Sequence, residues 1–121
     1  MSRFMLISLA PAEIPADFEI TPEMIQTIIS KYNAWTTKLQ NQGCLLDVNK
    51  LRDGDGRVLR GYGEGQVVTD GPYAETKEVI GGYWLITASS YQEAVDLARD
   101  CPTLEFGGTI EVREIEEFPT A

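Results

Sequence analysis

One short acidic segment gathers the residue types most able to do chemistry, Asp70-Gly71-Pro72-Tyr73-Ala74-Glu75-Thr76-Lys77-Glu78. Its ionisable side chains follow one another closely enough to shift each other's pKa values, as groups in catalytic and binding sites do. We therefore take Asp70 as the candidate catalytic residue, acting as a base or orienting the loop. Tyr73, Glu75 and Lys77 are candidate lining residues of a ligand pocket beside it.

The same segment also has a purely structural interpretation. An Asp before Gly-Pro favours a tight turn, because its carboxylate accepts a hydrogen bond from a nearby backbone N–H. Pro72 has no N–H, so that donor would be Tyr73 or a later residue. A pair such as Glu75 and Lys77 is also more often a solvated surface pair than a catalytic one. The sequence leaves the structural and the catalytic interpretation of Asp70 open.

A second candidate for ligand binding, Arg113, lies in the apolar-alternating segment 109–116. If Ile110 and Val112 face the helices, Arg113 faces the open surface of the sheet. There it either pairs with a carboxylate, such as that of Asp70 or Glu111, or binds an anionic ligand. Nearer the middle of the chain, Tyr83 and Trp84 are equally consistent with core positions and with an interface or pocket wall.

The chain contains no histidine. This excludes Ser-His-Asp and Cys-His catalysis and histidine-based zinc sites, so catalysis would run on carboxylates, Lys, Tyr, Cys or Arg. The two cysteines, Cys44 and Cys101, form no metal-binding or redox motif, and we expect free, buried thiols. The acidic turn at 53–56 lacks the spacing of a calcium loop, and the glycines at 61–65 match no nucleotide motif. We expect no cofactor and no metal.

Length and charge narrow the class of protein further. The 121 residues are enough for one domain, 1–121, with a core of its own. Nineteen acidic residues against ten basic ones leave a net charge of −9, which argues against nucleic-acid and anionic-membrane partners. Arg3 and the apolar run after it resemble a signal peptide, but a strand explains them as well. We expect a cytoplasmic protein.

Apolar spacing and capping residues predict the order of elements. A strand over residues 3–9 is apolar on both faces, and Thr21-Pro22 caps and opens a helix that ends near Gly43. Ser90 and Glu93 form a capping box for a second helix. The apolar stripe of the first helix should comprise Met24, Ile25, Ile28, Ile29, Tyr32, Trp35 and Leu39, and further strands are expected at 44–51, 58–62, 66–69, 82–87 and 109–116, with Cys44, Leu46 and Val48 on one face.

This order predicts an α+β fold of the ferredoxin-like split βαβ type, with an antiparallel sheet and an extra β-hairpin. Two helices can cover only one face of such a sheet. The first strand is apolar on both faces, and either Tyr83 or Trp84 must point away from the helices. A homodimer that packs sheet on sheet would cover the second face.

The sequence resembles the YCII-related family, and specifically its DGPF-motif branch. The resemblance is carried by VVTDGPYAETKEVIGGYWLI at residues 67–86, where Asp70-Gly71-Pro72-Tyr73 stands for Asp-Gly-Pro-Phe. FMLI at residues 4–7, Cys101-Pro102 and GGTIEVREI at residues 107–115 support it, so it extends over nearly the whole chain.

The resemblance implies a dimeric α/β-barrel, in which two protomers join through their sheets. Related proteins carry a His-Asp pair in a pocket and are proposed to act on small molecules, and an ungapped match places Tyr32 where the histidine would stand. Because this chain has no histidine, that pair cannot form, and we do not expect chemistry that depends on it. Members of the DGPF branch are also associated with alternative sigma factors, which suggests a regulatory context.

Three functions follow as hypotheses. The leading one is a homodimeric small-molecule-binding domain with a pocket near the Asp70 loop, where Arg113 supplies positive charge and Tyr32 and Trp84 line the wall. The second is a histidine-independent lyase or isomerase that uses a carboxylate or a tyrosine. The third is a protein-interaction or regulatory module.

Overall fold

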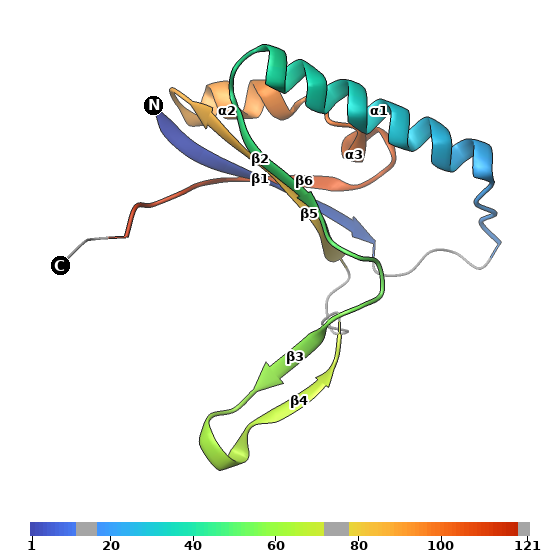
Figure 1. Ribbon diagram of the computed structural model, residues 1–121, viewed down its shortest axis with the longest axis vertical. Helices are drawn as coiled ribbons and strands as arrows, with labels where there is room; N and C mark the ends of the chain where they lie inside the picture. Colours follow the sequence, from blue (N-terminus) through green and yellow to red (C-terminus); the bar gives the residue numbers. More distant parts are fainter. Residues whose placement is uncertain (12–16, 72–77, 119–121) are drawn as a thin grey trace.

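A computed structural model describes residues 1–11, 17–71 and 78–118 (Figure 1). Its central element is a four-stranded antiparallel sheet with the strand order β2-β5-β1-β6, beside a separate two-stranded hairpin, β3-β4. The elements are β1 (Ser2–Pro11), α1 (Pro22–Asn41), β2 (Leu45–Lys50), β3 (Arg57–Arg60), a 3₁₀ turn η1 (Gly63–Gly65), β4 (Val67–Asp70), β5 (Glu78–Ala88), α2 (Tyr91–Ala98), α3 (Pro102–Glu105) and β6 (Thr109–Glu114).

The strand order confirms the predicted α+β, ferredoxin-like fold. Strands β1 and β2, which α1 joins, run in the same direction with β5 between them, because both pair antiparallel with β5. This is the split βαβ arrangement. Strand β6 follows α2 and α3 and pairs antiparallel with the other edge of β1. In the described residues, helices α1, α2 and α3 lie on one side of the sheet, and the hairpin projects on the other side (Figure 1).

Local signals set the ends of the two main helices. The Thr21 side chain accepts a hydrogen bond from the Met24 backbone N–H at 3.2 Å, and Pro22 opens α1. Gly43 follows the end of α1 with a φ of 74°, a conformation that glycine adopts at little cost. Ser90 caps α2 by accepting a hydrogen bond from the Glu93 backbone N–H.

The apolar stripe of α1 is narrower in the structure than the sequence predicts. Trp35 and Leu39 are buried, whereas Ile25 and Ile29 are each 47% exposed. The reason lies in the position of the helix, because the first turns of α1 extend past the strands (Figure 1). Side chains on those turns have no sheet beneath them.

The predicted strand after α1 differs in its facing residues. A register shift lies between Leu45 and Asp47 in the pairing of β2 with β5, so the alternation of faces breaks there. Leu45 packs against the core, whereas Leu46 is exposed. The expectation that Cys44, Leu46 and Val48 share one face is therefore wrong.

The core lies between the sheet and the helices. Phe4 and Leu6 of β1 and Ile86 of β5 are fully buried and face α1 and α2. Cys101 is buried and Cys44 is half-buried, and both thiols are free, as expected. Between Cys101 and β6 the chain also forms the short helix α3, which the sequence analysis does not predict.

The hairpin β3-β4 confirms the predicted insertion between the second strand and the central strand β5. Its root is the turn at residues 53–56, where Gly54 has a φ of 65°. Its tip contains Gly61, with a φ of 84°, and a Cβ there would lie 2.6 Å from the carbonyl oxygen of Gly65. Only glycine fits this tip without strain.

Candidate functional site

A chain of three hydroxyl groups lies between the sheet and the helices. Ser8 Oγ of β1 shares a hydrogen bond of 2.7 Å with Thr103 Oγ1 of α3, which shares another of 2.6 Å with Tyr32 OH of α1. Ser8 and Thr103 are buried and Tyr32 is half-buried. These hydrogen-bonded hydroxyls thus link strand β1 to helices α1 and α3, and the series ends at the partly accessible phenol of Tyr32.

Aromatic rings pack together at the Tyr32 end of this hydroxyl chain. The rings of Tyr32 and Trp84 are stacked, with centroids 5.8 Å apart and planes 11° apart. Trp35 meets Trp84 edge-on at 4.8 Å, and Trp84 Nε1 donates a hydrogen bond to Thr36 Oγ1. Tyr32 and Trp84, both predicted as pocket walls, therefore do lie together.

Burial determines the protonation states of Tyr32 and of the nearby thiol of Cys101. Burial raises the pKa of Tyr32, and the hydrogen bonds from Thr103 and Ser8 only partly offset it. Burial likewise raises the pKa of the Cys101 thiol. At neutral pH the phenol and the thiol both keep their protons, so Tyr32 acts there as a hydrogen-bonding group and not as a base.

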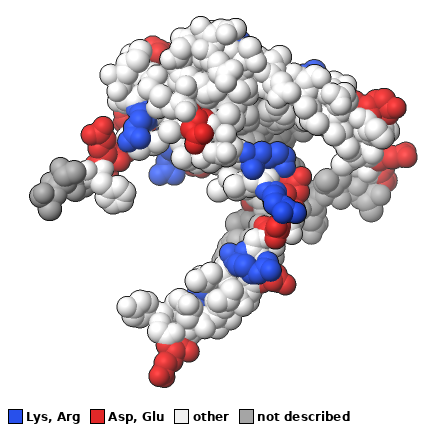
Figure 2. All heavy atoms as spheres, in the orientation of Figure 1, with Lys and Arg blue, Asp and Glu red and all other residues white. Residues whose placement is uncertain are grey.

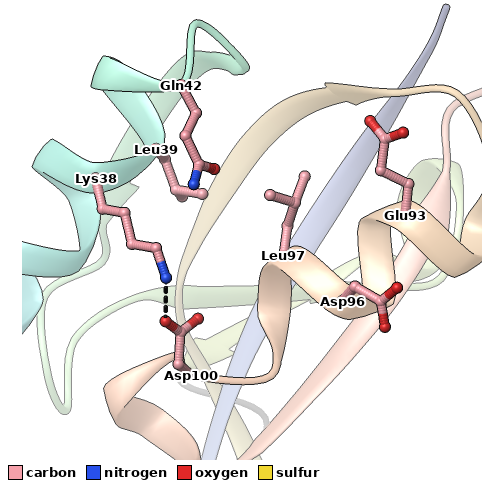
Figure 3. Close-up of a pocket in the computed structure, with 7 residues that line it drawn as sticks. All are labelled: Lys38, Leu39, Gln42, Glu93, Asp96, Leu97 and Asp100. Carbon is pink, nitrogen blue, oxygen red and sulfur yellow. Dashed lines mark hydrogen bonds and ion pairs between the residues drawn. The ribbon is translucent and has the colours of Figure 1, made fainter.

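Figure 3 shows a groove on the outer surface between α1 and α2. Its volume is about 200 Å³, and Lys38 and Asp100 form an ion pair of 2.6 Å at one end. Asp100 also accepts a hydrogen bond of 3.0 Å from Trp35 Nε1. Burial acts to raise the pKa of Asp100, but its hydrogen bonds with Lys38, Trp35 and its own backbone outweigh that effect and lower it. Lys38 and Asp100 thus neutralise each other, and Glu93 and Asp96 of α2 also line the groove.

On the opposite face of the sheet, polar side chains gather at the edge formed by β2. Tyr83 OH donates a hydrogen bond of 3.1 Å to Asp47 Oδ2, and Asn49 Nδ2 donates to Tyr83 OH at 2.8 Å and to Asp47 Oδ2 at 3.1 Å. Tyr83 belongs to β5 and points away from the helices, whereas its neighbour Trp84 points toward them. We call these three residues the β2-edge cluster.

Arg113 lies on this open face as well, as its alternation with Val112 predicts. Its guanidinium is 3.6 Å from the Glu111 carboxylate, and both side chains are exposed. Of the two carboxylates considered as partners, Glu111 pairs with Arg113, whereas Asp70 pairs with Arg57. The sheet separates Arg113 from the side that holds Tyr32 and Trp84.

Asp70 ends strand β4 on the hairpin. Its side chain is 94% exposed, and its carboxylate lies 3.6 Å from the Arg57 guanidinium on the paired strand. The next residue, Gly71, donates its backbone N–H to the Gly56 carbonyl at 2.9 Å. The other predicted lining residues of this loop, Tyr73, Glu75 and Lys77, lie outside the described residues. The ligand-binding role of the loop stays a prediction.

Sequence reasoning missed Ser8 and Thr103 as members of a site. Ser8 carries a detectable signal, because it is a hydroxyl on the helix-facing side of a strand whose neighbours on that side, Phe4 and Leu6, are apolar. A buried hydroxyl needs a hydrogen-bond partner. Thr103 carries no such signal, because the helix that positions it was not predicted.

Within residues 1–11, 17–71 and 78–118, no group of three or more Cys, Asp or Glu side chains is placed to hold a metal ion. No helix in the same part of the chain is both long enough and apolar enough to cross a membrane.

Fold and sequence together define an α+β domain of ferredoxin-like topology with an inserted hairpin. The chain belongs to the YCII-related domain family, whose profile matches residues 4–119. It is also similar to an uncharacterized protein of Rhizobium meliloti (strain 1021), with 46% identity over 50 residues. That match covers 40% of this chain and 40% of the relative's length.

Proposed function

We propose that this chain is a homodimeric small-molecule-binding domain of the DGPF branch of its family. The observation that carries the proposal is the unequal cover of the sheet. One face packs against three helices, whereas no helix of the described residues lies on the other face (Figure 1), which carries Met5, Ile7 and Leu85.

The open face has the composition of a protein interface. Met5 and Ile7 of β1 and Leu85 of β5 lie side by side in its middle, because Met5 pairs with Leu85 and Ile7 pairs with Tyr83. Polar groups flank this apolar centre, with Asp47 on the β2 edge and Arg113 on the β6 edge. An apolar centre with a polar rim is typical of specific interfaces. A second copy that packs sheet on sheet would cover it with an equivalent surface.

The ligand site is proposed at the hydroxyl chain of Ser8, Thr103 and Tyr32. The register shift of β1 against β5 lies next to Ser8, and such irregularities are over-represented beside active sites. Hydroxyl groups donate and accept hydrogen bonds without carrying charge. They suit a small neutral molecule with a carbonyl or hydroxyl group, whose flat or apolar part would lie near the rings of Tyr32 and Trp84.

Asp70 and Arg113 belong to the proposal as exposed groups on the side that a partner would cover. Asp70 would orient the loop that follows it, in which Tyr73, Glu75 and Lys77 stand. Arg113 would supply positive charge beside the dimer interface. These roles rest on the residue types and on the exposure of both side chains.

The test is a thermal-shift screen of the purified chain with small neutral hydroxyl and carbonyl compounds, followed by calorimetry on each compound that raises the melting temperature. Thr103→Val removes the middle hydroxyl, and we expect it to weaken binding by about tenfold or more. Thr37→Val on the exposed side of α1 is the matched control, and it should bind like the parent.

Asp70→Asn is tested with the same compounds. Unchanged affinity in Asp70→Asn would remove Asp70 from the proposal. Equal affinity of Thr103→Val and Thr37→Val would remove the hydroxyl chain. Light scattering on the same samples measures the mass, and a monomer at micromolar concentration would contradict the dimer.

The histidine-independent enzyme is a weaker alternative at this site. A tyrosine base must lose its proton near the working pH. Because burial raises the pKa of Tyr32, the phenol stays protonated at neutral pH. The third alternative, an interaction module, draws its support from the hairpin.

A further inference from the structure

We propose that the hairpin β3-β4 is an arm that packs across the open sheet face of a second copy of this chain. The proposal rests on the homodimer proposed above and adds which segment holds the two copies together. The hairpin comprises residues 57–70.

The hairpin carries a set of apolar side chains that its own chain leaves in solvent. The exposed fractions run from 56% for Val67 to 97% for Tyr62, with Leu59 and Val68 between them. Within the described part of the chain, β3 and β4 pack closely only against each other. The hairpin therefore has no core within the protomer.

A two-stranded hairpin without support is marginally stable in water. Yet this one has a regular register, in which Leu59 pairs with Val68 and Arg57 pairs with Asp70. Leu59 and Val68 point to the same side of the hairpin, because residues directly opposite each other in an antiparallel pair share a face. A regular hairpin with paired, exposed apolar residues calls for a surface on which to pack.

The area of the open face also calls for an additional contact. Four strands spaced about 4.8 Å apart and paired over about six residues of about 3.3 Å each span a plane of roughly 400 Å². A stable interface covers roughly 800 Å² of each partner. The sheet face is therefore small for a stable interface, and an apolar arm from each copy would add area to it.

Shape and charge favour a second copy as the partner. Figure 2 shows a hollow between the body of the molecule and the hairpin, with basic side chains gathered near the root of the arm. Residues 50–60 contain four basic and two acidic side chains, and Asp70 pairs with Arg57 at the same root, which leaves a small positive excess in a chain of net charge −9. Residues 111–117 contain four acidic side chains and one basic. The root of the arm is therefore complementary in charge to the end of strand β6 and the residues after it in another copy, and such complementarity favours association of chains that carry the same net charge.

The first experiment tests contact between copies directly. A paramagnetic label is attached to Tyr62→Cys in a Cys44→Ser background, since Cys101 is 1% exposed and will not react. The labelled chain is mixed with an isotopically labelled chain that carries no spin label. We expect broadening of the amide signals of Met5, Ile7 and Glu111 in the second chain.

The second experiment avoids a label at the tip. Leu59→Ser combined with Val68→Ser removes the apolar pair, and we expect the dimer dissociation constant to rise by about tenfold or more. Ile25→Ser combined with Ile29→Ser removes two similarly exposed apolar side chains from α1 and should leave that constant unchanged. Sedimentation velocity over a concentration series measures all three proteins.

The outcomes distinguish the proposed contact of the arm from dimerisation as such. A dimer without broadening, and with the same dissociation constant in both double variants, would overturn the arm and leave the homodimer standing. A parent chain that is monomeric at every concentration would overturn both. Broadening together with selective weakening in the Leu59 and Val68 variant would support the arm.

Discussion

The two faces of the four-stranded sheet use neighbouring residues of the same strands in different ways. On the covered face, Phe4 and Leu6 are fully buried within one chain. On the open face, Met5 and Ile7 alternate with them and stay partly accessible. A strand that is apolar on both faces can thus pack against a different partner on each face. One is completed by the chain's own helices, and we propose that the other is completed by a second chain.

The polar groups of the two faces differ in the same way. The hydroxyls of Ser8 and Thr103 are buried and bonded to each other, so removing one breaks a hydrogen bond that water does not replace. Asp47 and Asn49 of the β2-edge cluster are exposed, and water can replace their bonds. Substitution of a polar group on the covered face should therefore lower the stability of the fold. A similar substitution on the open face should have little effect in the monomer.

The largest expected effect compares neighbouring positions on β1. Leu6→Ala removes a fully buried side chain and should lower the free energy of unfolding by about 2–5 kcal/mol. Ile7→Ala, on the open face, should cost clearly less in a monomeric sample. Urea unfolding at a protein concentration below dimerisation measures both. Equal losses would show that the two faces are packed alike within the protomer.

The second prediction addresses assembly. Ile7→Asp places a charge in the apolar centre of the open face and should raise the dimer dissociation constant by about a hundredfold or more. The fold of the protomer should persist, because Ile7 does not face the helices. Sedimentation and circular dichroism check the two statements separately. A dimer as tight as the parent would move the interface elsewhere.

The third prediction compares buried and exposed polar groups. Thr103→Val keeps the shape of the side chain but leaves the hydroxyls of Ser8 and Tyr32 without their shared partner, at a cost of about 1–3 kcal/mol. Asn49→Ala, in the exposed β2-edge cluster, should change stability by less than about 0.5 kcal/mol. Thermal and urea unfolding of both variants measure the two losses. A larger loss in Asn49→Ala than in Thr103→Val would contradict the prediction.

The smallest expected effect is a pH dependence from Asp100. Its pKa is lowered in the folded chain, so its contribution to stability is complete above the pKa of the unfolded state and is lost as pH falls through the folded value. The side chain is 53% exposed, so the contribution should stay below about 1 kcal/mol. Asp100→Asn should flatten the fall in stability below about pH 4.

Lys38→Met tests the same ion pair from the other side. It should reduce the loss of folding stability at low pH, as Asp100→Asn does. Urea unfolding midpoints from pH 3 to pH 7 measure this pH dependence. If both variants lose stability at low pH as the parent does, the acid sensitivity belongs to other carboxylates.

Local signals were enough to predict most of the fold. Thr21-Pro22 and the Ser90–Glu93 pair fix the starts of two helices within a few residues, and glycine turns fix the hairpin. The candidate site could not be predicted in this way. Ser8 and Thr103 are 95 positions apart, and their contact depends on how α3 docks against β1. The exposure of Ile25 and Ile29 likewise depends on how far α1 reaches past the sheet, which no local pattern encodes.

The strand order also determines when the protein can fold during its synthesis. Strand β1 lies in the middle of the sheet, but its partners are β5 and β6, and residues 12–77 separate β1 from the start of β5. Chains emerge from the ribosome N-terminus first, so β1 leaves with both of its hydrogen-bonding edges unpaired. Pairing over such sequence distances is slow compared with local contacts. The most apolar strand of the domain must therefore be kept from aggregating until residues 78–114 have been made.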